Sequence, residues 1–168
     1  MLRKIVSGGQ TGVDRGALDA ALEAGFPCGG WCPEGRRAED GPIPVRYPVA
    51  ELAGAGYRQR TRQNVVDSDG TLIVFFGELS GGTLETMRFC ERLGKPFHLA
   101  DCGSTDVEAI AADAAAFVQA RAIAVLNVAG PRESSRPGAG ECARRIVRSL
   151  LTNRPEMPQV SPDNGAKS

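Results

Sequence analysis

The stretch Ser7-Gly8-Gly9-Gln10-Thr11-Gly12-Val13-Asp14-Arg15 lies near the start of the 168-residue chain. The apolar residues 2–6 before it predict a strand, and residues 14–24 predict a helix, because their apolar positions recur at helical spacing. Glycines between a first strand and a first helix let the backbone approach an anion, toward which the first amides of the helix point. The stretch therefore predicts an α/β protein that binds an anionic ligand.

Further along the chain, strand-like and helix-like segments alternate. Strands are predicted at residues 71–76, 97–100 and 123–128, and helices at residues 58–67, 83–93, 105–119 and 139–151. This order predicts a Rossmann-like three-layer α/β fold with a mostly parallel central sheet and right-handed crossovers.

Two segments differ from this alternation. Residues 26–56 are rich in glycine and proline, so regular structure should be sparse there, and a long loop of this kind is often functional. Residues 153–168 carry further prolines and polar residues, and we expect them to form a disordered C-terminal tail. Residues 1–152 are then expected to form a single domain.

Composition restricts the class of protein. Lys and Arg balance Asp and Glu at 20 each, so the formal net charge is zero, which argues against a nucleic-acid partner. No apolar run approaches membrane-spanning length, and Arg3 and Lys4 lead directly into the opening motif without a signal peptide. Five scattered cysteines suit a reducing compartment better than a disulfide framework. We therefore expect a cytoplasmic protein without a membrane partner.

Three polar turns, at residues 7–15, 77–82 and 129–138, follow predicted strands. Because the carboxyl ends of parallel strands meet at one edge of a sheet, these turns should form one anion site, overlooked by the arginine-rich helix at residues 58–67. The candidate cofactor-binding residues are Gly8, Gly9, Gln10, Thr11, Gly12, Asp14, Arg15, Arg60, Asn64, Gly81, Gly82, Thr83, Glu85, Asn127, Gly130, Arg132, Glu133 and Ser134. No cysteine or histidine cluster has a convincing metal-ligand spacing, so no metal held by side chains is predicted.

Some candidates admit two interpretations. Arg15 either contacts a phosphate or pairs with Asp14 or Asp19. Glu85, expected in the first turn of its helix, is either an acid favoured by the helix dipole or a carboxylate that faces the ligand and acts as acid or base. The single His98 falls within a strand, and no Ser/His/Asp or Cys/His arrangement is evident. The residues therefore favour binding over catalysis.

A set of motifs spans nearly the whole chain up to about Leu151. They are the segments 7–15, 29–36 with 38–41, 60–61 with 64–65, 67–73, 81–83 and 126–134. In these motifs the chain resembles the family of molybdenum carriers, the circularly permuted YpsA-like branch of the SLOG nucleotide-binding superfamily. The resemblance implies a homo-oligomer, dimer or tetramer, that stores or transfers the molybdenum cofactor, a phosphate-bearing pterin with a dithiolene-bound molybdenum oxo group. Molybdoenzymes or cofactor-synthesis proteins are the implied protein partners.

A more distant similarity is to the lysine-decarboxylase-like phosphoribohydrolases, whose Gly-Gly-x-Gly-Thr turn is longer and is followed by acids. Here the stretch Gly81-Gly82-Thr83-Leu84-Glu85 lacks the intervening residue and glycine, and Thr86 stands where a second acid is expected. The main hypothesis is a carrier of an anionic nucleotide-like ligand. The alternatives are a nucleotide-processing hydrolase, with Glu85 as its catalytic residue, and a nucleotide sensor.

Overall fold

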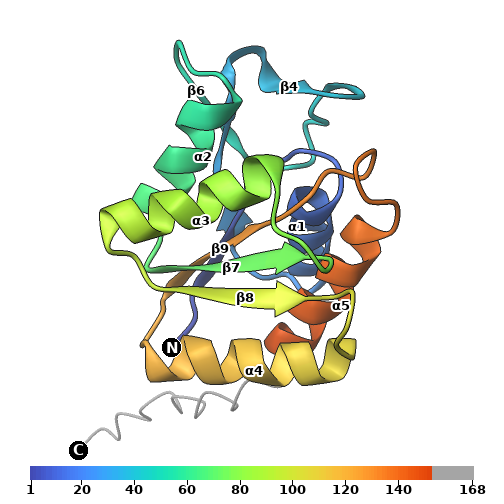
Figure 1. Ribbon diagram of the computed structural model, residues 1–168. Coiled ribbons are helices and arrows are strands. Elements are labelled where there is room, and N and C mark those ends of the chain that lie inside the picture. Colours follow the sequence, from blue (N-terminus) through green and yellow to red (C-terminus); the bar gives the residue numbers. More distant parts are fainter. Residues whose placement is uncertain (153–168) are drawn as a thin grey trace, which may run out of the picture.

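A computed structural model describes residues 1–152, and the tail predicted at residues 153–168 lies outside the described residues. At its centre is a five-stranded sheet in the order β2-β1-β9-β7-β8, in which every strand pair is parallel (Figure 1). The strands are β1 (Lys4–Val6), β2 (Cys28–Gly29), β7 (Gly70–Phe75), β8 (Phe97–Asp101) and β9 (Val125–Ala129). The predicted Rossmann-like fold with a parallel central sheet is confirmed.

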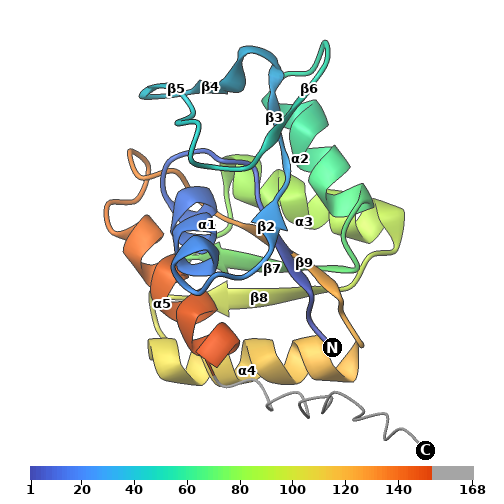
Figure 2. The ribbon, with the colours of Figure 1, turned by 180° about the vertical axis from the view of Figure 1, so that it is seen from behind.

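Helices cover both faces of the sheet and complete the three layers. One face carries α2 (Tyr57–Val66) and α3 (Gly81–Leu93), which lie in front in Figure 1. The other face carries α1 (Val13–Glu23) and α5 (Ala139–Thr152), which lie in front in Figure 2, with α4 (Val107–Ala120) packed against α5. Each helix begins and ends within two residues of its predicted position.

The core lies on both faces of β7, as its continuous apolar run predicts for a central parallel strand. Leu72 and Val74 belong to the apolar cluster that includes side chains of α1, α4 and α5. Ile73 belongs to the cluster on the other face, with Val65 of α2 and Phe89 of α3. These three β7 side chains are fully buried. The strand that separates the two helix layers is therefore fixed by apolar contact on each side.

Residues 30–56 form an excursion between β2 and α2, seen above the sheet in Figure 1. Regular structure is sparse there, as expected: its elements are β3 (Trp31–Pro33), the 3-10 turn η1 (Glu34–Arg36), β4 (Arg37–Ala38), β5 (Gly41–Pro42) and β6 (Ala50–Leu52). A small core of Cys32, Ile43, Tyr47 and Val49 packs this excursion against Leu18 of α1. The excursion is thereby held close to the first polar turn, which precedes α1.

Gly16 marks the crossing of α1 and α5. An added Cβ at this position would lie 2.0 Å from the carbonyl oxygen of Gly140. Because a backbone atom cannot yield as a flexible side chain does, Gly16→Ala should lower the free energy of unfolding by about 1–3 kcal/mol. Urea denaturation measures this loss. In the control variant Gly82→Ala, nothing lies within 4 Å of the added Cβ, and stability should hold or rise; equal losses in both variants would contradict the packing argument.

Candidate functional site

The site lies where the direction of the chain crossovers reverses. From β1 the chain crosses to β2 on one side, from β7 it crosses to β8 on the other, and β9 lies between them. Open α/β sheets bind ligands at such a topological switch point. A pocket of about 800 Å³ opens here, lined by residues at and beyond the carboxyl ends of β1, β7 and β9 and by residues of α2 and α3. The three turns that the sequence predicted to meet do lie together.

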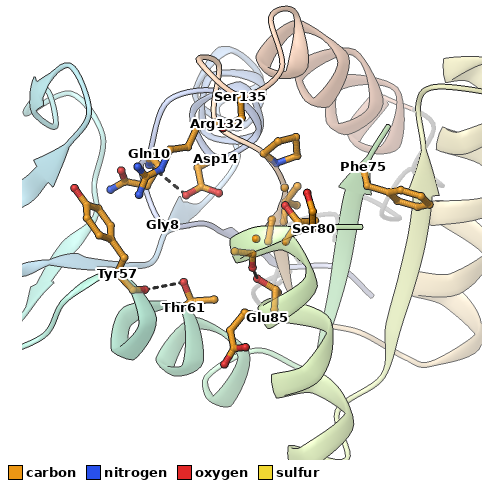
Figure 3. Close-up of a pocket in the computed structure, with 18 of the residues that line it drawn as sticks. Gly8, Gln10, Asp14, Tyr57, Thr61, Phe75, Ser80, Glu85, Arg132 and Ser135 are labelled. Carbon is orange, nitrogen blue, oxygen red and sulfur yellow. Dashed lines mark hydrogen bonds between the residues drawn. The ribbon is translucent and has the colours of Figure 1, made fainter. Parts of the chain in front are cut away.

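Most of the predicted cofactor-binding residues line the pocket. Those that line it are Gly8, Gln10, Asp14, Arg60, Asn64, Gly81, Gly82, Thr83, Glu85, Asn127, Gly130 and Arg132. Figure 3 shows side chains from the first turn, α2, α3 and the third turn around one opening, including Asp14, Tyr57, Thr61, Ser80, Glu85 and Arg132. The predicted residues outside the lining are Gly9, Thr11, Gly12, Arg15, Glu133 and Ser134.

Part of the first turn contacts the protein itself. A Cβ added to Gly12 would lie 2.4 Å from the carbonyl oxygen of Pro131, and the amide of Val13 donates to that oxygen at 3.1 Å. A Cβ added to Gly8 would lie 1.5 Å from the Arg60 guanidinium. The sequence predicted that the glycines and helix amides of this turn serve a ligand. In the structure, Gly12 makes room for the third turn and the amide of Val13 donates a hydrogen bond to it.

Arg15 has a partner that the sequence did not suggest. Its guanidinium donates to both carboxylate oxygens of Asp40, at 2.5 and 2.8 Å, and this contact lowers the pKa of Asp40. Its partner is neither Asp14 nor Asp19, so the second of the two interpretations of Arg15, a pair with one of these acids, is wrong. Glu133 accepts hydrogen bonds from the amides of Gly138 and Gly140, at 2.6 and 3.1 Å, near the start of α5.

The N-terminus of α3 faces the pocket without a side-chain cap. The helix begins at Gly81, two residues earlier than predicted, and the preceding Ser80 makes no capping hydrogen bond through its side chain. The first amides of a helix have no intrahelical partner and carry partial positive charge. Glu85 consequently lies in the second turn, and its predicted position in the first turn is wrong. These amides are available to an anion in the pocket.

Two of the four arginines that line the pocket form ion pairs. Arg58 on α2 pairs with Glu85 on α3 at 2.8 Å, and this arginine is largely exposed. Arg60 pairs with Asp14 at 3.2 Å, and there the side chains are only 12% and 6% exposed. The buried pair joins α2 to the first turn and forms one wall of the pocket.

The other two arginines stack on aromatic rings. The guanidinium of Arg132 lies 4.5 Å from the ring centre of Tyr57, and that of Arg136 lies 4.6 Å from Phe76. No ion pair within residues 1–152 involves either arginine. Glu78 is the remaining carboxylate of the lining, so arginines outnumber carboxylates by four to three. With the open end of α3, the pocket has a positive bias that suits an anion.

Buried amide side chains fix the walls. Asn64 accepts a hydrogen bond from the backbone amide of Trp31 at 2.8 Å and donates to its carbonyl at 3.0 Å, which joins α2 to β3. Gln10 donates from Nε2 to the Arg37 carbonyl at 2.8 Å, and its Oε1 is a buried acceptor without a partner among residues 1–152. Both residues were predicted as ligand contacts, and their observed bonds hold the excursion against the pocket.

Several lining residues were not among the candidate cofactor-binding residues, although some of them lie within the predicted turns or on the helix predicted at residues 58–67. They are Tyr57, Arg58, Thr61, Phe75, Phe76, Glu78, Ser80, Thr86, Val128, Ala129, Pro131, Ser135 and Arg136. Arg58 and Thr61 lie on the helix that was expected to overlook the site, and Arg136 lies within the third turn, so proximity along the chain was an available signal. The rings of Tyr57 and Phe76 gave no comparable signal, because an aromatic residue beside an apolar segment usually belongs to the core.

The fold and the pocket define a Rossmann-like α/β protein with a polar pocket at the switch point of its sheet. The chain belongs to the circularly permuted YpsA SLOG family, whose family model matches residues 5–151. It is similar to a crystal structure from Syntrophus aciditrophicus SB, described as "Putative molybdenum carrier protein", with a TM-score of 0.87 and 41% sequence identity over 89% of this chain and 95% of that one. A comparison with curated proteins gave no significant match.

Within residues 1–152, no helix combines the length and apolar character needed to cross a membrane. The same residues contain no group of three or more His, Cys, Asp or Glu side chains arranged to hold a metal ion. Burial raises the pKa of the Cys28 and Cys32 thiols, which keeps both in the protonated form at neutral pH.

Proposed function

We propose that this protein binds and carries an anionic, nucleotide-like ligand, and that the ligand is the molybdenum cofactor, held for storage or transfer. The observation that carries the proposal is the open N-terminus of α3 beside Arg132 and Arg136, whose charges no ion pair neutralises within the described residues. Backbone amides and guanidinium groups are the donors that proteins use for phosphate and other oxyanions. The similarity to a protein named as a molybdenum carrier supports this choice of ligand.

The donor set of the pocket fits the chemistry of that cofactor. Its phosphate and its anionic metal–dithiolene group both require hydrogen-bond donors, which the α3 amides, Arg132 and Arg136 supply. Its pterin ring is flat, and Tyr57 and Phe76 offer aromatic faces in the same pocket. A volume of about 800 Å³ is within the usual range for a small-molecule site. When bound, the cofactor would bring its own metal.

A ligand screen on the purified protein tests this proposal. Thermal-shift measurements and native mass spectrometry would compare the molybdenum cofactor, molybdate, tungstate and common nucleotides. We expect the melting temperature to rise with the cofactor by mass action, as for any ligand that binds only the folded state. A clear shift with a nucleotide, together with none for any pterin or oxyanion, would exclude the molybdenum carrier.

Glu85→Gln separates the carrier from the hydrolase. Glu85 pairs with the exposed Arg58, so the loss of this pair should lower the free energy of unfolding by less than about 1 kcal/mol. With GMP as the nucleotide probe, the binding affinity should change less than about fivefold. The carrier predicts no turnover in either form of the protein. Consumption of nucleotide by the wild type, abolished in Glu85→Gln with affinity retained, would instead support the hydrolase; calorimetry and product analysis give the two readouts.

The remaining parts of the proposal concern the setting of this protein. We infer a single Rossmann-like domain at residues 1–152, a cytoplasmic homo-oligomer, dimer or tetramer, and transfer of the cofactor to molybdoenzymes or cofactor-synthesis proteins. Family membership supports these inferences. Size-exclusion chromatography with light scattering tests the oligomeric state, and a monomer at micromolar concentration would contradict it.

A further inference from the structure

Glu39 binds two of the polar turns at once. It lies in the hairpin formed by β4 and β5, and its carboxylate accepts hydrogen bonds from the hydroxyl groups of Thr11 and Ser134. The backbone amide of Ser134 approaches the same carboxylate at 3.4 Å. Thr11 belongs to the first turn and Ser134 to the third. A carboxylate of the chain itself therefore occupies the position between these turns where the sequence predicted an external anion.

The hairpin has a second anchor next to the first. Asp40 forms a bidentate ion pair with the Arg15 guanidinium. The Nε of Arg15 also donates a hydrogen bond to the Gly9 carbonyl at 3.0 Å. The hydrogen bond from Ser134 lowers the pKa of Glu39, so its carboxylate is ionised at neutral pH, and the nearby charge of Arg132 acts in the same direction. Both neighbouring carboxylates are thus compensated by donors from the turns beneath the hairpin.

The loop bound by Glu39 is the one that carries the unpaired arginines. In this arginine loop, defined as residues 131–136, Arg132, Ser135 and Arg136 line the pocket, whereas Glu133 and Ser134 do not. One side of the loop therefore faces the pocket and another contacts the hairpin. Within the loop, the amide of Arg136 donates to the carbonyl of Arg132 at 3.0 Å. A clamp on Ser134 thereby restrains both guanidinium groups.

We propose that Glu39 is a positioning residue for ligand binding: as a carboxylate at an exposed position, held by the hydroxyl groups of two turns, it clamps the arginine loop so that Arg132 and Arg136 are presented to the pocket. The gain in affinity comes from preorganisation, because the loop is ordered before the ligand arrives. This role rests on the proposed function for its ligand, but the clamp itself can be measured without any ligand.

Chemical rescue of Glu39→Ala tests the clamp. Removal of the carboxylate empties the space between Thr11 and Ser134, so amide hydrogen exchange at residues 132–136 should accelerate at least about tenfold, and the affinity for GMP should fall about tenfold. Sodium acetate should restore both quantities toward the wild-type values, because a small carboxylate refills the space. Sodium chloride at equal ionic strength should not.

Two further variants make the test specific. Glu34→Ala removes the same charge from another exposed position of the excursion, one whose carboxylate is not bonded to Thr11 or Ser134, and should leave exchange and affinity unchanged. Glu39→Gln fills the space without the charge, so it should show a partial loss that acetate does not rescue. Unchanged exchange in Glu39→Ala, or equal effects of acetate and chloride, would overturn the clamp. If exchange responds as expected but wild-type protein binds neither GMP nor any pterin, the clamp stands and the proposed function fails.

Discussion

Asp14→Ala is expected to lower the free energy of unfolding by about 3–5 kcal/mol, the usual cost of removing one partner from a buried ion pair. The Asp14 side chain is 6% exposed, and its carboxylate forms an ion pair with the Arg60 guanidinium at 3.2 Å. It also accepts a hydrogen bond from the backbone amide of Gln10 at 3.2 Å. Without it, the guanidinium of Arg60, whose side chain is only 12% exposed, has no counter-charge, and its Nε is already a buried donor without a partner in the described part of the chain. Removal of the carboxylate leaves this cation uncompensated.

Urea denaturation of Asp14→Ala measures this cost, and Glu23→Ala is the matched control. Glu23 lies on the same helix and pairs with Arg144, but these side chains are 47% and 38% exposed, so its loss should cost at most about 1 kcal/mol. The double variant Asp14→Ala/Arg60→Met should be more stable than Asp14→Ala, because it also removes the positive charge that Asp14→Ala leaves without a counter-charge. Equal stability of Asp14→Ala and Glu23→Ala would contradict this prediction, because it would show that the Arg60 guanidinium becomes hydrated when Asp14 is removed.

The sequence predicted the features that depend on local pattern and chain order. The run from Thr71 to Phe76 is apolar on both faces, so a central strand was expected, and the observed strand, Gly70–Phe75, has buried side chains on both faces. The alternation of strands and helices predicted a parallel sheet, and in such a sheet the turns after β1, β7 and β9 must share an edge. The general position of the site followed from this topology, before any side-chain contact was known.

Contacts across long distances in sequence could not be predicted in this way. Glu39 reaches Thr11 and Ser134, which are 28 and 95 residues away in sequence. It lies in the turn of a hairpin whose strands have only two residues each, too short to show a periodic pattern. A glycine is equally ambiguous, since it permits close approach by any atom. The sequence could not reveal that the group close to Gly12 is the Pro131 carbonyl, because that contact exists only after α1 and the third turn pack together.

Gly82→Asp is expected to reduce the affinity for inorganic phosphate and for GMP at least about 100-fold while it leaves stability unchanged or raises it. An added Cβ at Gly82 meets nothing within 4 Å, so the new side chain fits. A carboxylate at a helix N-terminus is favoured by the dipole and stabilises by about 0.3–1 kcal/mol. In the pocket, however, it competes with the ligand for the same amides and repels it. Two lost charge-assisted hydrogen bonds, at about 1.5–3 kcal/mol each, correspond to about 100-fold or more.

The opposite direction of the two effects separates this mechanism from general damage to the fold. Calorimetric titration measures the affinities, and thermal denaturation measures stability. Gly82→Asn has a side chain of nearly the same size without the charge, so its affinity should fall less than about tenfold. Equal losses in both variants would mean that the side chain blocks the pocket by its volume. Full affinity in Gly82→Asp would show that the anion binds elsewhere, since a carboxylate at the start of α3 cannot share these amides with a phosphate without a large electrostatic cost.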